Sequence, residues 1–288
     1  AYVFVYNAGV WSEQAYLKPS NTGTGDDFGF SVAITGDTIV VGAPVEDSNA
    51  NTINGDGSDI TGGNFGAAYV YVRSGSTWSQ QAYLKAANSG AEDWFGYAVA
   101  ADGDTVLVGA PFEDSAAIGI NGDGADNSAV NSGAAYVFVR SGVTWSQQAY
   151  LKASNTQAGD VFGRSVALTG ESALLGAPSE DSSATGVNGN GADNSAEDAG
   201  AAYVFTRSGT TWSQQAYLKA SNSGAGDHFG YAVSLSGESG VIGAPIESSS
   251  ATTVNGNGAD NSAFSAGAAY VFTRSGTAWS QQAYLKAA

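Results

Sequence analysis

The sequence contains no cysteine and only one histidine, His228. Without cysteine there is no disulfide framework, no thiolate metal site and no cysteine nucleophile. A single histidine leaves almost no room for histidine-based catalysis. No apolar run reaches the ~18 residues of a membrane span, so we expect no membrane insertion. We expect no signal peptide in the residues given, and the chain opens inside a strand-like run, AYVFVY, which predicts a piece of a longer protein.

Basic residues are also scarce. Ten Lys and Arg stand against 27 Asp and Glu, which gives a formal net charge of −17 and argues against nucleic acid as a partner. Glycine supplies 40 of the 288 residues, whereas hydrophobic residues make up 43%. This composition predicts a sizeable core built from many short strands and tight turns rather than from helices.

One period of 67 residues runs through the whole chain without insertion or deletion. Every copy repeats a tryptophan, a Phe-Gly pair and a proline. The repeated tryptophans are Trp11, Trp78, Trp145, Trp212 and Trp279. A spacing this regular predicts one structural unit copied in tandem.

Each unit contains four segments with strand character. In the second copy they are 95–101, 105–111, 134–139 and 145–153. The third is apolar on both faces, and the fourth alternates apolar and polar residues. We expect the first three strands to lie between neighbouring sheets and the fourth to form an exposed outer edge. Stacked four-stranded antiparallel sheets with two apolar faces are typical of an all-β fold, the β-propeller.

The period predicts four complete blades and one half blade in a single domain. Their boundaries are 1–18 for the half blade, then 19–87, 88–154, 155–221 and 222–288. Three arrangements of the half blade remain open. It stands alone as an incomplete fifth blade, it belongs to a longer propeller, or its open strand edge pairs with another chain.

The Phe-Gly pairs at 28–29, 95–96, 162–163 and 229–230 are each followed by Gly-Ala-Pro, at 42–44, 109–111, 176–178 and 243–245. This pattern resembles the FG-GAP repeat, the blade unit of integrin α-subunit propellers and of many bacterial extracellular proteins. The resemblance implies a β-propeller, an extracellular location (secreted or cell surface) and a role in binding or adhesion. Integrin-like repeats carry a calcium loop between the two motifs. Here that interval holds only a tight turn, so calcium is not expected at that position.

Acidic residues gather in the connections on one predicted face, which holds 21 of the 27. The long loop between the second and third strands repeats a core of the form NGDGSD or NGNGAD. Oxygen side chains at such spacing, with glycine between them, suit Ca²⁺. The candidate ligands are Glu46, Asp47, Asn54, Asp56, Asp59, Glu113, Asp114, Asn121, Asp123, Asp126, Glu180, Asp181, Asn188, Asn190, Asp193, Glu247, Asn255, Asn257 and Asp260. The alternative is that these residues form Asx-turns, which close a loop without any ion.

Other repeated residues have plainer interpretations. For Asp26, Asp93, Asp160 and Asp227 we expect turn-capping carboxylates that accept backbone N–H groups. For the repeated tryptophans we expect packing against the neighbouring blade. For the lysines that close the fourth strands we expect a solvated edge. Aromatic residues that depart from the repeat are candidates for contact with a partner, namely Trp94, Phe112 and Phe264.

Three functions compete. The first is a non-catalytic extracellular module that binds a protein or glycan ligand, its acidic loops ordered by calcium. The second is a structural protein whose copies join through open blade edges into an array or fibre. The third is a carboxylate-based hydrolase. It ranks last because the acids are spread over equivalent loops and no phosphate-binding or serine-nucleophile motif is present. A carboxylate-rich surface also suits a saline habitat, which composition does not separate from ligand binding.

Overall fold

The computed structural model describes residues 1–58 and 62–288, and within them every regular element is a β-strand. The first two strands form a sheet of their own: β1 (Tyr2–Asn7) and β2 (Val10–Tyr16). The next sheet contains β3 (Ser31–Thr35), β4 (Thr38–Ala43), β5 (Ala67–Ser74) and β6 (Thr77–Leu84). The second complete sheet contains β7 (Ala98–Asp102), β8 (Thr105–Ala110), β9 (Ala134–Ser141) and β10 (Thr144–Leu151).

The remaining two sheets repeat the pattern. The third contains β11 (Ser165–Thr169), β12 (Ser172–Ala177), β14 (Ala201–Ser208) and β15 (Thr211–Lys219), with the short β13 (Gly186–Val187) added beside β15. The fourth contains β16 (Ala232–Ser236), β17 (Ser239–Ala244), β18 (Ala268–Ser275) and β19 (Ala278–Leu285). Each is an antiparallel meander, so the predicted four blades and a half are confirmed.

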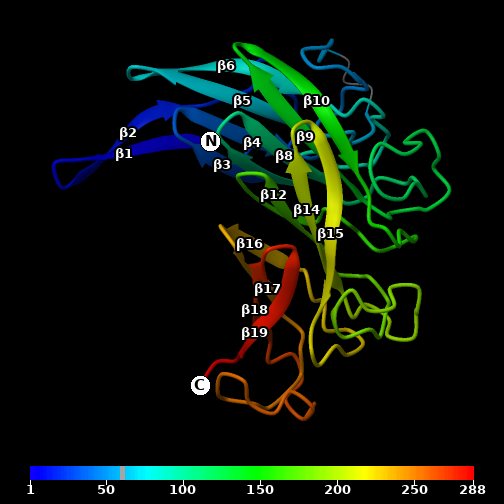
Figure 1. Ribbon diagram of the computed structural model, residues 1–288. Coiled ribbons are helices and arrows are strands. Elements are labelled where there is room, and N and C mark those ends of the chain that lie inside the picture. Colours follow the sequence, from blue (N-terminus) through cyan, green and yellow to red (C-terminus); the bar gives the residue numbers. More distant parts are fainter. Residues whose placement is uncertain (59–61) are drawn as a thin grey trace.

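The blades follow one another around an open arc (Figure 1). The half blade lies at one end and the β16–β19 sheet at the other, with empty space between the two ends. Within the described residues β1 and β2 pair only with each other, so the half blade is a separate two-stranded sheet. No described helix is long and apolar enough to cross a membrane.

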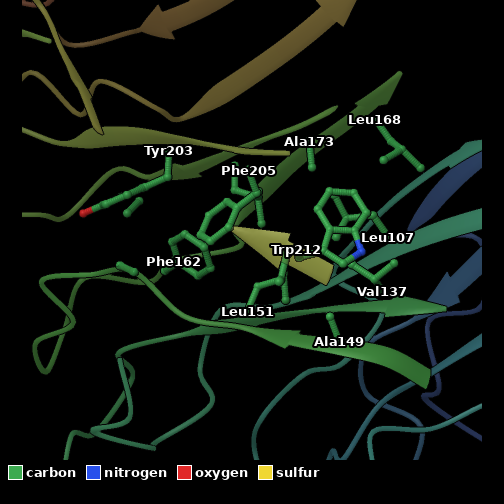
Figure 2. Close-up of a cluster of buried hydrophobic side chains, with 14 of the residues drawn as sticks. Leu107, Val137, Ala149, Leu151, Phe162, Leu168, Ala173, Tyr203, Phe205 and Trp212 are labelled. Atoms are coloured by element: carbon green, nitrogen blue, oxygen red, sulfur yellow. The ribbon is translucent and has the colours of Figure 1, made fainter. Parts of the chain in front are cut away.

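Neighbouring blades pack face to face, an aliphatic face against an aromatic one. Between the second and third complete blades, Leu107, Val137 and Leu151 meet Phe162, Tyr203, Phe205 and Trp212. Figure 2 shows these side chains converging from the two sheets. The same aliphatic-on-aromatic contact joins the other pairs of blades. Because burial of apolar area drives this packing, each blade depends on its neighbours for stability.

The two glycine motifs mark the closest approach between blades. A Cβ added to Gly109, in Gly-Ala-Pro, would lie 2.0 Å from the carbonyl oxygen of Gly163, in the Phe-Gly of the next blade. A Cβ added to Gly42 would likewise lie 2.0 Å from the carbonyl oxygen of Gly96. The Phe-Gly glycines also have positive φ, which glycine adopts without strain. The Phe-Gly and Gly-Ala-Pro motifs recur in every blade because the backbones of two neighbouring blades touch where these glycines lie.

A bulge in each fourth strand links it to the next blade. The register shifts at Gln148, so that this residue has no partner on β9. The Oε1 atom of Gln148 accepts a hydrogen bond from Trp212 Nε1 of the following blade at 2.8 Å. The same bond joins Trp78 to Gln14, Trp145 to Gln81 and Trp279 to Gln215. The prediction that the repeated tryptophans pack against the neighbouring blade is therefore confirmed for these four.

Two details of blade packing differ from expectation. The first strands are only half-buried, as in β7, because they line the inner side of the arc. In the first three complete blades the fourth strands β6, β10 and β15 are exposed mainly in their first half, whereas their last residues are buried. The long loop folds back over that end, through β13 beside β15 and through a bridge between Ile120 and Leu151. The fourth strand, predicted to be an exposed outer edge, therefore has some of its backbone groups paired with the long loop.

Candidate functional site

The connections between strands two and three and between strands four and one interlock on one side of the arc (Figure 1). Glu92 N–H donates to Gly63 O at 2.6 Å, and Gly226 N–H donates to Glu197 O at 2.8 Å. Each bond joins the connection that enters a blade to the long loop of the blade before it. The short hairpins lie at the opposite ends of the strands, so the acidic connections share one face as predicted.

A buried ion pair ties each long loop to its own blade. Lys152 Nζ, at the end of the fourth strand, lies 2.8 Å from Glu113 Oε2, and both side chains are almost fully buried. Tyr150 Oη and Asn88 Nδ2 donate to Glu113 Oε1. Equivalent pairs are Lys85–Glu46, Lys219–Glu180 and Lys286–Glu247.

The expectation of solvated lysines is wrong for these four residues. The repeat identifies the lysine and the glutamate of each pair as recurring residues. It does not predict that the long loop brings the glutamate back to the lysine. Burial lowers the pKa of Lys85, Lys152 and Lys219, because a charged ammonium loses hydration there. Lys18, the equivalent residue in the half blade, is exposed.

The candidate calcium ligands fall into groups with different surroundings. The glutamates Glu46, Glu113, Glu180 and Glu247 are the partners of the buried lysines. The asparagines Asn54, Asn121, Asn188 and Asn255 accept the backbone N–H of the fourth-strand tyrosine at 2.8–2.9 Å. Asp47, Asp114 and Asp181 accept backbone N–H groups from across the loop.

The remaining candidates cap local turns. Asp56, Asp123, Asp126, Asn190, Asp193, Asn257 and Asp260 each accept the N–H of the residue two positions later. Asp59 lies outside the described residues. Within the described part of the chain, no group of three or more Asp, Glu or His side chains lies close enough to hold a metal ion. As placed, these donors fit Asx-turns better than a preformed calcium cage, and calcium at these loops stays a prediction.

The repeated aspartates before Phe-Gly act as expected. Asp93 accepts the N–H of Gly90 at 2.7 Å, and Asp26, Asp160 and Asp227 accept the equivalent N–H groups. Burial opposes their ionisation and raises the pKa of Asp93 to about 7, of Asp160 to about 8 and of Asp227 to about 6. Their part is to cap turns.

Two of the aromatic residues that depart from the repeat come together at the inner end of this face. Trp94 and Phe112 meet edge to face, with ring centroids 5.0 Å apart. Tyr97 lies against both rings, at 6.2 and 6.3 Å. Phe264 lies apart from them, in the long loop of the last blade, and is 88% exposed.

Sequence reasoning missed the rest of this cluster. The residues directly after Phe-Gly are Phe30, Tyr97, Arg164 and Tyr231, and they touch in series across four blades. The ring centroids of Phe30 and Tyr97 are 4.9 Å apart, and the Arg164 guanidinium lies 5.8 Å from the Tyr97 ring and 3.5 Å from the Tyr231 ring. The clue was present in the sequence, because this position also varies among otherwise similar copies.

A hollow of about 210 Å³ opens beside Arg164. Phe112, Val161, Arg164, Pro178, His228 and Tyr231 line it. The Nδ1 atom of His228 lies 3.1 Å from Pro178 O, and because a carbonyl only accepts, this nitrogen carries the proton. We call Trp94, Tyr97, Phe112, Arg164, His228 and Tyr231 the aromatic patch.

The backbone under the patch is unusual. Trp94, Val161 and His228 occupy one repeat position and have φ of 55°, 50° and 55°. This left-handed conformation is costly for large side chains and most unusual for a β-branched residue. Backbone hydrogen bonds to the preceding long loop hold it, such as His228 N–H to Asp198 O at 3.0 Å. The large side chains are therefore held on a rigid backbone.

Comparison with known proteins gives one result. The family model described as FG-GAP repeat matches four stretches, residues 11–71, 78–138, 145–205 and 212–272. Curated proteins yielded no match to the chain. The four matches share the 67-residue spacing and together span most of the sequence.

Proposed function

Because the chain belongs to the FG-GAP repeat family, whose repeats are typically non-catalytic, we propose that it is an extracellular binding module that uses the aromatic patch. One observation carries the proposal. Trp94, Tyr97, Phe112, Arg164 and Tyr231 form one contact series across adjacent blades at positions where the fold accepts other residues. Tryptophan, tyrosine and arginine are the side chains that dominate binding energy at protein interfaces.

The surroundings of the patch favour a positively charged partner. The acidic connections emerge on the same side, and the chain carries a net charge of −17. Glu92 lies next to Trp94 and accepts its indole N–H at 3.3 Å. Complementary charge raises association rates and selects against acidic partners. We therefore propose a basic segment of an extracellular protein as ligand, with its apolar or cationic side chains on the rings.

Binding to immobilised peptides and glycans tests the proposal. We expect the protein to retain basic peptides, more weakly as salt rises, and Trp94→Ala to weaken binding about 30-fold, as loss of a hot-spot residue does. Phe264→Ala removes an exposed aromatic outside the patch and serves as the control. Retention of neutral glycans alone, or binding that Trp94→Ala leaves unchanged, would contradict the proposal.

A further inference from the structure

Among the described residues, Arg164 is the only arginine that forms no ion pair. The others each pair with an aspartate or glutamate of their own blade, namely Arg73, Arg140, Arg207 and Arg274. Acidic partners are not scarce, because the chain contains 27 Asp and Glu. Arg164 is half-buried, and its equivalents in the other complete blades are Phe30, Tyr97 and Tyr231. The fold therefore does not require a cation at this position.

Most of the hydrogen-bonding groups of this guanidinium are unused. Its Nη1 atom donates to Tyr231 O at 3.0 Å, and its central carbon lies 3.5 Å from the centroid of the Tyr231 ring. No other acceptor in the part of the chain that the structure describes lies within hydrogen-bond distance of its remaining N–H groups. The carbonyl and the ring thus hold a planar guanidinium in place with donors to spare. Arginine binds carboxylates through such donors, often in two parallel hydrogen bonds.

The hollow of about 210 Å³ beside Arg164 has the lining of a ligand site. Its walls are mostly apolar, and the polar side chains on them are those of Arg164, Ser179 and His228. Ser179 replaces Phe112 of the preceding blade, and its hydroxyl has no hydrogen-bond partner within the described residues. No aspartate or glutamate is among the residues that line the hollow. A mostly apolar hollow with a few polar groups is typical of binding sites for small groups.

We propose that this hollow binds one carboxylate of the ligand, with the Arg164 guanidinium and the Ser179 hydroxyl as donors. The inference rests on the proposed function, because the carboxylate belongs to the basic segment proposed above as ligand. It comes from an acidic side chain of that segment or from its C-terminus. One guanidinium and one hydroxyl match the two oxygens of a carboxylate. The greater charge of a phosphate suits this acidic face less well.

The site would make recognition selective. The net charge of −17 disfavours acidic groups over the rest of the protein surface. A basic segment with a carboxylate at one particular position would gain a charge-assisted contact at Arg164, whereas a carboxylate elsewhere in the segment would be repelled. Attraction at one place and repulsion around it together select one ligand from many.

Binding of paired lysine-rich peptides tests the inference. Each pair differs at one position, which is aspartate in one peptide and asparagine in the other, and a further pair has a free or an amidated C-terminus. The net charge of the protein favours the asparagine and amidated peptides in general. We expect one aspartate position, or the free C-terminus, to bind about tenfold more tightly instead, as a hydrogen bond to a charged group does.

Variants of Arg164 connect that preference to the hollow. Arg164→Tyr introduces the residue that two other copies have at this position, so the variant should fold, and Arg164→Gln removes the charge with less change in shape. Both should lose the preference for the carboxylate and still bind the asparagine peptides. Arg207→Gln makes the same chemical change at a hairpin on the opposite side and should keep the preference. Circular dichroism checks that each variant is folded.

The outcomes separate this inference from the proposed function. If asparagine and amidated peptides bind at least as tightly in every pair, while Trp94→Ala still weakens binding, the carboxylate site is wrong and the binding module stands. A carboxylate preference that persists in Arg164→Tyr and Arg164→Gln would also overturn the site. Lysine-rich peptides that fail to bind, or that bind equally well to Trp94→Ala, would overturn the proposed function and the carboxylate site with it.

Discussion

The lysine that ends each fourth strand lies in two different environments in this chain. Lys152 is buried against Glu113, Tyr150 and the long loop, whereas Lys18 in the half blade is exposed. The long loops have little regular structure, and such loops usually need something to order them. The buried pair and the capped turns supply that order from the chain's own side chains.

Replacement of this lysine should cost stability only where the pair is buried. Lys152→Met leaves the charge of Glu113 without its partner, so we expect a loss of about 3 kcal/mol or more in the free energy of unfolding. Lys18→Met makes the same chemical change at an exposed site and should alter stability by less than about 0.5 kcal/mol. Urea unfolding of both variants measures the difference. Equal effects at the two positions would show that the pair does not hold the loop.

The capping aspartates predict how stability depends on pH. Burial raises the pKa of Asp160 from its ordinary value of 3.8 to about 8. Between these values folded Asp160 binds a proton that the unfolded chain does not, so its contribution to stability is fully present below about pH 4 and is lost as the pH rises through 8. Asp93 and Asp227 act in the same direction over narrower ranges.

Asp160→Asn should reduce that dependence. Asparagine keeps an oxygen that accepts the N–H of Gln157 but carries no charge, so the variant should gain stability over the unmodified protein near pH 8 and not near pH 4. Urea unfolding at a series of pH values measures this. Asp123→Asn, at an exposed turn, is the control. If the dependence of unfolding free energy on pH were the same in Asp160→Asn as in the unmodified protein, the raised pKa assigned to Asp160 would be contradicted.

At the scale of the element, the two glycine motifs are constrained by the next blade and not by their own strand. Gly109 touches the carbonyl of Gly163, whereas Gly243 in the last blade has no atom nearer than 3.7 Å to an added Cβ. The first glycine of Gly-Ala-Pro is therefore crowded by the next blade at Gly109 but has free space around it at Gly243.

This difference gives a matched test. Gly109→Ala forces two backbones apart and should destabilise the protein by about 3 kcal/mol, at the upper end of overpacking effects. Gly243→Ala should change stability by less than about 0.5 kcal/mol. Thermal or urea unfolding distinguishes the two. If Gly243→Ala were as harmful as Gly109→Ala, contact between blades would not explain the motif.

The long loop is the element for which calcium was predicted. With its oxygens already engaged in turns and ion pairs, we expect EDTA to leave the melting midpoint unchanged, whereas Lys152→Met lowers it. A midpoint that falls in EDTA and recovers with added calcium would establish the calcium hypothesis instead.

At the scale of the whole molecule, the sequence was enough to predict the blades, because the 67-residue period and the strand patterns are local signals. The prediction that the acidic connections lie on one side followed from the up-and-down order of the four strands in each blade. The partners of the lysines could not be predicted, because they depend on the path of the loop. Trp94 and Phe112 were identified because they break the repeat. Arg164 was missed although it breaks the repeat too, and Tyr231 was missed because it matches Tyr97 and because its contact with Arg164 joins two blades.

Hydrogen exchange measured with and without a bound basic peptide tests the central claim, that the aromatic patch is the binding surface. We predict slower exchange at 92–97, 111–114, 161–166 and 228–233, where the patch and its backbone lie, with little change at the hairpins on the opposite side. Protection confined to those hairpins or to β1 and β2 would contradict the account.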